Sequence, residues 1–303
     1  MKGHTPVLIV EVLDSLNLAP GTRILDCTVG LGGHAKAILE RTSPNGTLCG
    51  FDRDMRNLEL ARVTLAAFGD RVSLIHDSFA NIGAHSLPSM DGILFDLGFS
   101  SLHVDDASRG FSFQKDGPLD MRYDITQELT AETIVNSWSR EDLADLFRIL
   151  GEEPKANFIA KEILQSRRKE RITTTLQLAE IIERVSPRRG KIHPATKVFQ
   201  ALRMEVNDEL GQINYGLKAS LELLKPRGRL AVITFHSLED RLVKQFIKNN
   251  EQLSRVTKKP IRPTWEEQKS NARSRSAKLR VAEKIGGYEE RDRKNKNSSS
   301  EAD

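Results

Sequence analysis

Short apolar runs followed by amphipathic stretches set the pattern of the first part of the chain. Four of the runs show little polar alternation, which is typical of parallel strands covered on both faces. They are Arg23–Cys27, Gly46–Asp52, Val72–His76 and Asp91–Asp96. Helical periodicity appears between them, as in Asn57–Phe68, where apolar side chains share one face. Strands and helices that alternate at this spacing predict a doubly wound α/β sheet.

The alternation stops after about residue 106, and helical signals replace it until about residue 205. Ser139 has the character of an N-cap, and the apolar stripe behind it closes at Gly151. Thr174 and Gln177 form a second capping-box pattern. We therefore expect a mainly helical insertion in this stretch.

A fifth strand at Gly228–Phe235 resumes the sheet, and Ser237 is predicted to cap the helix that follows it. From about residue 251 the chain is polar and basic, and its Lys-, Asn- and Ser-rich end is expected to be disordered. Together these patterns predict an α/β sheet domain interrupted by a helical domain and followed by a tail. The expected bounds are 1–105 and 206–285 for the sheet domain, 106–205 for the insertion and 286–303 for the tail.

Charge divides unevenly along the chain, although Lys and Arg together number 46 against 42 Asp and Glu. Residues 1–154 hold 13 basic and 23 acidic side chains, whereas residues 155–203 hold 12 and 4. Residues 248–303 are basic again, with 15 against 9. Separated blocks of positive charge are typical of proteins that bind polyanions such as RNA, although two solvated basic faces give the same count.

Composition narrows the classes of protein further. No run of about 18 apolar residues is present, so no membrane span is predicted, and the N-terminus lacks the pattern of a signal peptide. Cys27 and Cys49 are too few for a disulfide framework, and no C-x-x-C zinc pattern occurs. A cytoplasmic protein is the expectation.

A glycine-rich turn directly after the first strand is the strongest candidate for a cofactor site. It spans residues 26–34, and its Gly32 and Gly33 let a ligand approach backbone N–H groups. Asp52 ends the second strand, where a carboxylate can accept hydrogen bonds from an adenosine ribose, and Phe79 is placed to cover the adenine. Nicotinamide and S-adenosylmethionine enzymes share this outline. The absence of G-x-G-x-x-G and the acidity of the cleft favour a sulfonium ligand over a pyrophosphate.

Further motifs follow one another in order along residues 4–285. They include His4–Leu8, Thr28–His34, Asp52–Asp54, Asp96–Ser101, Arg109–Phe113, Asp116–Arg122, Gly151–Glu153, His193–Thr196, Phe199–Arg203, Phe235–Arg241 and Arg273–Arg280. Through them the sequence resembles the small-subunit ribosomal RNA methyltransferase H family, the S-adenosylmethionine-dependent cytosine-N4 methyltransferases. The resemblance implies a Rossmann-like class I methyltransferase sheet with an inserted helical RNA-recognition domain. It also implies S-adenosyl-L-methionine as cofactor and methyl transfer to N4 of a cytidine in the decoding region of small-subunit rRNA, near the P site.

The resemblance also implies a set of cofactor contacts. The set is Gly32, Gly33, His34, Asp52, Phe79 and Asp96, with His103 at a position where the family usually has Gln. A histidine can still make one hydrogen bond there, so we expect the contact to persist with a changed pH dependence.

The chemistry expected of this site needs no covalent enzyme nucleophile. A cytosine-C5 methyltransferase needs an attacking thiolate, whereas Cys27 and Cys49 lie in predicted buried strands. Amino methylation depends instead on aligning the methyl donor with the acceptor. We expect Asp96 to bind cofactor and to accept a hydrogen bond from N4–H, and His236 to line the substrate pocket or take up a proton. A capping or structural role is the alternative for both residues.

Basic and aromatic residues supply the candidates for RNA contacts. Arg109 and Arg122 suit phosphate, and Phe111 suits stacking on a base, although a loop packed by its own aromatic residues gives the same pattern. In the basic insertion the candidates are Arg167, Arg168 and Lys169. The segment Arg273–Lys278 is a second basic candidate.

Two alternatives to the rRNA methyltransferase stay open at the level of the sequence. One is an amino-methyltransferase that acts on DNA or another RNA. The other is a non-catalytic rRNA-binding assembly factor that keeps the fold. The oligomeric state does not follow from the sequence.

Overall fold

The computed structural model describes residues 6–98, 106–188, 190 and 193–286. The chain divides into two compact units, of which the first is Met1–Gly98 with Leu210–Asp303 and the second is Phe99–Glu209. The second unit begins before residue 106 and ends after residue 205, the bounds expected for the insertion. Of the tail expected to be disordered, residues 287–303 lie outside the described residues.

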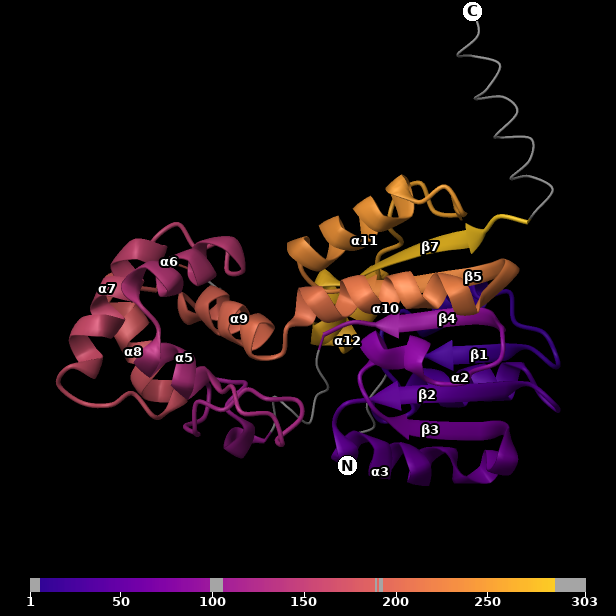
Figure 1. Ribbon diagram of the computed structural model, residues 1–303, viewed down its shortest axis with the longest axis horizontal. Coiled ribbons are helices and arrows are strands. Elements are labelled where there is room, and N and C mark those ends of the chain that lie inside the picture. The colour runs from indigo at the N-terminus through magenta and orange to yellow at the C-terminus, as the bar shows by residue number, and fades with distance from the viewer. Residues whose placement is uncertain (1–5, 99–105, 189, 191–192, 287–303) are drawn as a thin grey trace, which may run out of the picture. The chain divides into compact units, whose positions relative to one another are not determined.

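A twisted sheet of seven strands in the described residues forms the centre of the first unit (Figure 1). Its order is β3-β2-β1-β4-β5-β7-β6, and the first five of these strands run parallel. Their bounds are β1 Arg23–Asp26, β2 Thr47–Asp52, β3 Val72–His76, β4 Met90–Asp96 and β5 Leu224–Thr234. The predicted α/β class is confirmed, and the order with a reversed strand beside β5 is that of a Rossmann-like class I methyltransferase sheet.

Helices cover both faces of this sheet and bury a separate apolar cluster on each. Ile24 and Leu94 point toward the helices α1 to α3, whereas Leu25 and Phe95 point toward α10 and α11. The bounds are α1 Ile9–Ser15, α2 Gly33–Arg41, α3 Met55–Leu65, α10 Glu209–Leu223 and α11 Ser237–Asn249, with the 3₁₀ turns η1 Ala66–Arg71 and η2 Phe79–Ala84. Burial on both faces explains why the strand sequences are almost continuously apolar.

The last part of the first unit completes the sheet, although its sequence resembles a basic tail. Its elements are β6 Leu253–Arg255, α12 Trp265–Ser270, η4 Ala272–Ser276 and β7 Lys278–Lys284. In β7, Leu279 is fully buried, while the neighbouring Lys278 and Arg280 both bind Asp240 of α11 at 3.1 and 2.7 Å. The polar segment expected from about residue 251 is therefore ordered and paired up to the end of β7, because its charges alternate with buried apolar side chains.

The second unit is built from helices around its own apolar core. Thr174 caps α8 in the predicted capping box with Gln177, and Ser139 caps α6 as predicted. Phe147 is fully buried in the core. The bounds are η3 Ala107–Arg109, α5 Ala131–Ser137, α6 Arg140–Ile149, α7 Ala156–Arg167, α8 Thr175–Val185 and α9 Ala195–Val206. Across the residues that the structure describes, every helix is too short or too polar to span a bilayer.

Candidate active site

Three aspartates end neighbouring parallel strands, Asp26 on β1, Asp52 on β2 and Asp96 on β4. Since β1 pairs with β2 on one side and with β4 on the other, the strand order reverses at β1. Open α/β sheets bind their ligands outside the carboxyl ends of the strands, at such a switch point. The three carboxylates therefore mark the ligand edge of this sheet.

Asp26 is the most deeply buried of the three, with 1% of its surface exposed. Its Oδ1 accepts a hydrogen bond from the Thr28 N–H at 3.1 Å, whereas its Oδ2 is buried without a hydrogen-bond partner among the described residues. Burial raises the pKa of Asp26 to about 7, against the opposing effect of the nearby His34. A buried oxygen without a partner is costly, and a bound donor would relieve that cost.

Asp96 lies beside Asp26 and also has a buried carboxyl oxygen without a partner among the described residues. Its backbone N–H donates to Thr28 Oγ1 at 2.6 Å, and its Oδ1 is buried without a hydrogen-bond partner in the described part of the chain. The side chain as a whole is 21% exposed, so one edge of the carboxyl group reaches the surface. Burial raises the pKa of Asp96, while His34 and Arg273 act in the opposite direction.

His34 is held between Asp96 and the start of the first unit. Its Nε2 lies 2.9 Å from the Val7 carbonyl oxygen, which can only accept, so Nε2 carries the hydrogen. Its Nδ1 lies 3.5 Å from Asp96 Oδ2. At this distance the ring lowers the pKa of Asp96, against the larger effect of burial. His34 is 6% exposed, so its ring can influence a bound cofactor only through Asp96.

The glycine-rich turn shapes this edge through its backbone. Gly30 has a φ of 53°, and its N–H donates to Asp52 Oδ2 at 2.9 Å. Gly32, with a φ of 83°, is the N-cap of α2. A Cβ on Gly33 would lie 2.6 Å from Cγ of Pro6, so packing alone requires glycine there.

Asp52 and Phe79 each have partners within the first unit. The Asp52 carboxylate also accepts from the Asp54 N–H at 2.8 Å and from the Asn57 side-chain amide at 3.3 Å, so the first unit holds this carboxylate firmly in place. Phe79 is half-buried and meets Phe95 edge-on, with ring centroids 5.4 Å apart. The predicted contact His103 lies outside the described residues.

Neither cysteine can serve as a nucleophile. Cys27 and Cys49 are buried and free. Burial raises the pKa of the Cys27 thiol well above its usual range and that of Cys49 to about 11. Because both stay protonated at neutral pH, ring attack of the cytosine-C5 type has no thiolate here.

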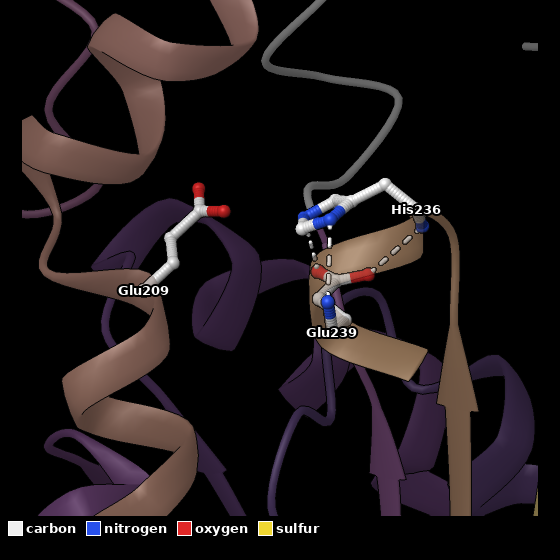
Figure 2. A group of neighbouring side chains, drawn as sticks. All are labelled: Glu209, His236 and Glu239. Atoms are coloured by element: carbon white, nitrogen blue, oxygen red, sulfur yellow. Dashed lines mark hydrogen bonds and ion pairs between the residues drawn. The ribbon is translucent and has the colours of Figure 1, made fainter. Parts of the chain in front are cut away.

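His236 is the N-cap of α11, where the sequence pattern placed Ser237 (Figure 2). Its Nδ1 accepts from the Glu239 N–H at 3.4 Å, and Glu239 Oε2 accepts from the His236 N–H at 3.2 Å. His236 Nε2 lies 3.1 Å from Glu239 Oε1, although it is not aligned for a hydrogen bond. With Nδ1 accepting, the hydrogen of a neutral ring is on Nε2. In this arrangement the Nδ1 lone pair is used in capping α11.

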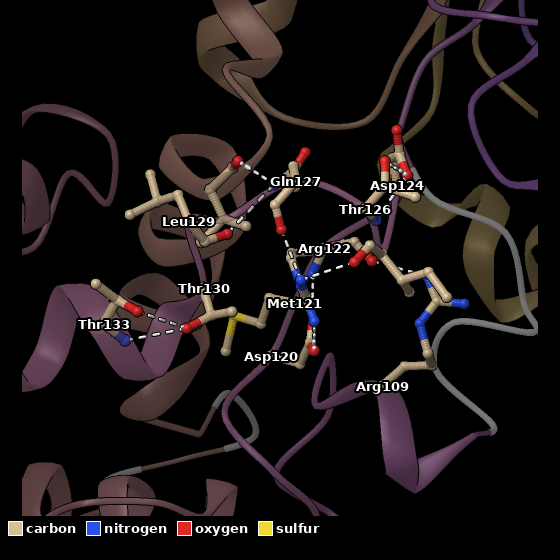
Figure 3. A network of polar contacts seen from close by, with 12 residues as sticks. Arg109, Asp120, Met121, Arg122, Asp124, Thr126, Gln127, Leu129, Thr130 and Thr133 are labelled. Atoms are coloured by element: carbon tan, nitrogen blue, oxygen red, sulfur yellow. Dashed lines mark hydrogen bonds and ion pairs between the residues drawn. The ribbon is translucent and has the colours of Figure 1, made fainter.

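The second unit uses Arg109 and Arg122 internally (Figure 3). Arg109 is 5% exposed and donates to the carbonyl oxygens of Arg122 and Tyr123 at 2.7 and 3.0 Å. Arg122 binds both oxygens of Asp120 at 2.9 and 2.7 Å. Phe111 stacks on Tyr123, with centroids 5.4 Å apart and planes inclined by 12°. These three candidates for RNA contact thus hold their own loop together.

The other basic candidates lie at the end of α7. Arg167 is half-buried and donates to the Val135 carbonyl oxygen at 2.8 Å. Arg168 and Lys169 are both exposed. Of the three, Arg168 and Lys169 are therefore better placed than Arg167 to meet a polyanion.

The residues at the ligand edge fit a cationic cofactor with hydrogen-bond donors. Asp26 and Asp96 each present a buried oxygen that lacks a partner among the described residues. S-adenosylmethionine carries an ammonium group, which donates, and a positively charged sulfonium. From the sequence, Asp26 contributed to the expected acidity of the cleft but was not among the predicted cofactor contacts, although it opens the glycine-rich turn. The fold and this edge define an S-adenosylmethionine-dependent methyltransferase.

Comparison with known proteins gives the particular family. The chain belongs to the MraW methylase family, whose model matches residues 1–285. It is 46% identical to ribosomal RNA small subunit methyltransferase H of Symbiobacterium thermophilum, over 95% of this chain and 98% of that protein. The protein of the same name from Desulfotalea psychrophila is also 46% identical, over 94% and 99% of the two chains. That from Cyanothece sp. is 48% identical, over 94% and 96%.

The raised pKa of Asp26 gives a prediction for stability. Between about pH 4 and 7 the folded state holds the Asp26 proton while the unfolded state releases it, so stability falls as pH rises through this window. A difference of about three pKa units corresponds to about 4 kcal/mol.

We predict that Asp26→Asn, which keeps the Oδ1 acceptor, flattens this slope in urea unfolding of the ligand-free protein at pH 5 and pH 8. Asp70→Asn, at an exposed site, is the control and should leave the slope unchanged. Parallel pH curves for Asp26→Asn and wild type would contradict the assignment.

Proposed function

We propose that this protein transfers a methyl group from S-adenosylmethionine to N4 of a cytidine in the decoding region of small-subunit rRNA, near the P site. The observation that carries the proposal is the pair of buried carboxylates, Asp26 and Asp96, at the switch point of a methyltransferase sheet. Relatives of about 46% identity are named ribosomal RNA small subunit methyltransferase H, which supports the substrate. Work on ribosomal subunits would place the protein in the cytoplasm.

The site supports amino methylation through alignment. The bound cofactor supplies an electrophilic methyl group, which a neutral amino group can attack directly. Asp96 reaches the surface with one edge of its carboxyl group, and we assign it the hydrogen bond from N4–H that orients the acceptor lone pair. Because burial raises its pKa, Asp96 is also the better proton acceptor when the methylated nitrogen loses its proton. Because Cys27 and Cys49 stay protonated, they do not supply the thiolate that methylation at C5 of cytosine requires.

His236 receives a positioning role in this proposal. Its Nδ1 is engaged by the Glu239 N–H, so it fixes the first turn of α11. The cofactor contacts of Gly32, Gly33, His34, Asp52 and Phe79 remain part of the proposal. For His34 we assign the contact to its backbone, since the ring is occupied by the Val7 carbonyl oxygen and Asp96.

The helical unit is proposed to recognise RNA through exposed cations. Arg168 and Lys169 at the end of α7 are the candidates that we retain for phosphate contacts, since Arg109 and Arg122 bind carbonyl and carboxylate oxygens of their own unit. The net basic charge of residues 155–203 supports this assignment.

The function is tested by methyl transfer from tritium-labelled S-adenosylmethionine to small ribosomal subunits, naked small-subunit rRNA and DNA. We expect label in small-subunit rRNA, and nucleoside analysis should return N4-methylated cytidine from the decoding region. Label in DNA alone would establish the DNA alternative, and label in no substrate would favour the non-catalytic assembly factor. A labelled C5 or ribose position would contradict the amino chemistry.

The double variant Arg168→Glu with Lys169→Glu tests the RNA assignment. Loss of two phosphate contacts is expected to weaken binding to small-subunit rRNA and to reduce the slope of log K against log salt by about two. Affinity for S-adenosylmethionine should stay unchanged. Filter binding across salt concentrations and calorimetry measure the two quantities.

A charge-matched control separates this effect from net charge alone. Lys244→Glu with Lys248→Glu reverses two exposed cations on α11 and should keep the salt slope of wild type. An equal loss of slope in both double variants would show that the α7 cations have no specific part in RNA binding.

A further inference from the structure

An exposed tryptophan lies in the basic segment of the first unit. Trp265 opens α12 and leaves 67% of its surface exposed, which is unusual for the largest apolar side chain. The Lys269 ammonium lies 5.2 Å from the centre of its ring. A flat aromatic surface beside a cation is the arrangement on which proteins stack bases of single-stranded nucleic acid.

Positive charge surrounds this ring in the sequence and on the surface. Residues 255–275 hold seven Lys and Arg against two Glu, Glu266 and Glu267. Glu267 turns inward, because its Oε1 accepts from the Leu8 N–H at 2.9 Å. The exposed cations are Arg255, Lys258, Lys259, Arg262, Lys269 and Arg275. Such a surface attracts phosphate and disfavours a basic protein segment.

The same segment is tied to the cofactor edge within the first unit. The Glu267 bond to Leu8 fixes α12 beside Val7, whose carbonyl oxygen binds His34. After α12 comes the short turn η4, whose Arg273 partly opposes the effect of burial on the pKa of Asp96. A nucleotide held on α12 would therefore lie near the edge where the methyl acceptor must enter.

We propose that Trp265 is a stacking platform for an unpaired nucleotide of the RNA substrate, with the exposed cations from Arg255 to Arg275 neutralising the neighbouring phosphates. This inference rests on the proposed function, since it takes the polyanion to be RNA. An unpaired base near the target is consistent with the chemistry, because an N4 amino group is reached only when its base is unpaired or extruded.

The test uses the full chain and a twelve-nucleotide oligouridylate, which forms no stable secondary structure. The protein has two tryptophans, so Trp265→Phe leaves Trp138 as the sole indole. We expect the oligonucleotide to quench the fluorescence of wild type and not that of Trp265→Phe. In anisotropy with labelled oligouridylate, Trp265→Phe should bind within a few fold of wild type, whereas Trp265→Ala should bind about 5- to 150-fold more weakly.

Matched controls decide the outcome. Tyr215→Ala removes an aromatic side chain of 58% exposure from α10 in the same unit and should bind as wild type does. Trp265→Ala with wild-type affinity, or equal quenching by oligoglutamate, would overturn the inference. Methyl transfer to small-subunit rRNA, measured in the same preparations, keeps the two proposals apart. If wild type transfers no methyl group while Trp265 still binds oligouridylate, the proposed function fails and the platform stands.

Discussion

Buried carboxyl groups at the switch point of the sheet are the constraint on which the site depends. Asp26 and Asp96 each hold an oxygen that finds no hydrogen-bond donor in the described residues, and burial raises the pKa of both. Their strands are paired side by side in parallel register, so the two groups cannot move apart without breaking the central sheet. A ligand with positive charge and N–H donors suits both carboxyl groups. A pyrophosphate would instead place further negative charge beside them.

The residues around Asp26 and Asp96 oppose the effect of burial on the pKa of these two groups only in part. The His34 ring lies 3.5 Å from Asp96 and is fixed by the Val7 carbonyl oxygen, and both His34 and Arg273 oppose the effect of burial on the pKa of Asp96. The same burial raises the pKa of the Cys27 thiol, which stays protonated and does not act as a nucleophile. Electrostatic orientation of donor and acceptor, without covalent catalysis, is the chemistry that these residues favour together.

Much of the fold and part of the site could be predicted from sequence, because those features are local. Asp52 and Asp96 end apolar runs of parallel-strand character, and Thr174 lies three residues before Gln177. For Arg109 and His236 the sequence left a binding role and a structural role open. A guanidinium that binds carbonyl oxygens and one that binds phosphate look alike in sequence, and only the tertiary structure reveals the partner. Strand β7 could not be predicted for a similar reason, since its Lys278 and Arg280 pair with Asp240 of α11.

Calorimetric binding of S-adenosylmethionine and of its product S-adenosylhomocysteine, whose sulfur is neutral, to wild type and Asp96→Asn tests the central claim most directly. The two ligands differ at the sulfur, which is cationic only in the methyl donor. If the buried carboxylates hold that charge, Asp96→Asn should weaken the donor by about tenfold or more and the product much less. Equal loss of affinity for both ligands, or no loss for either, would contradict the account.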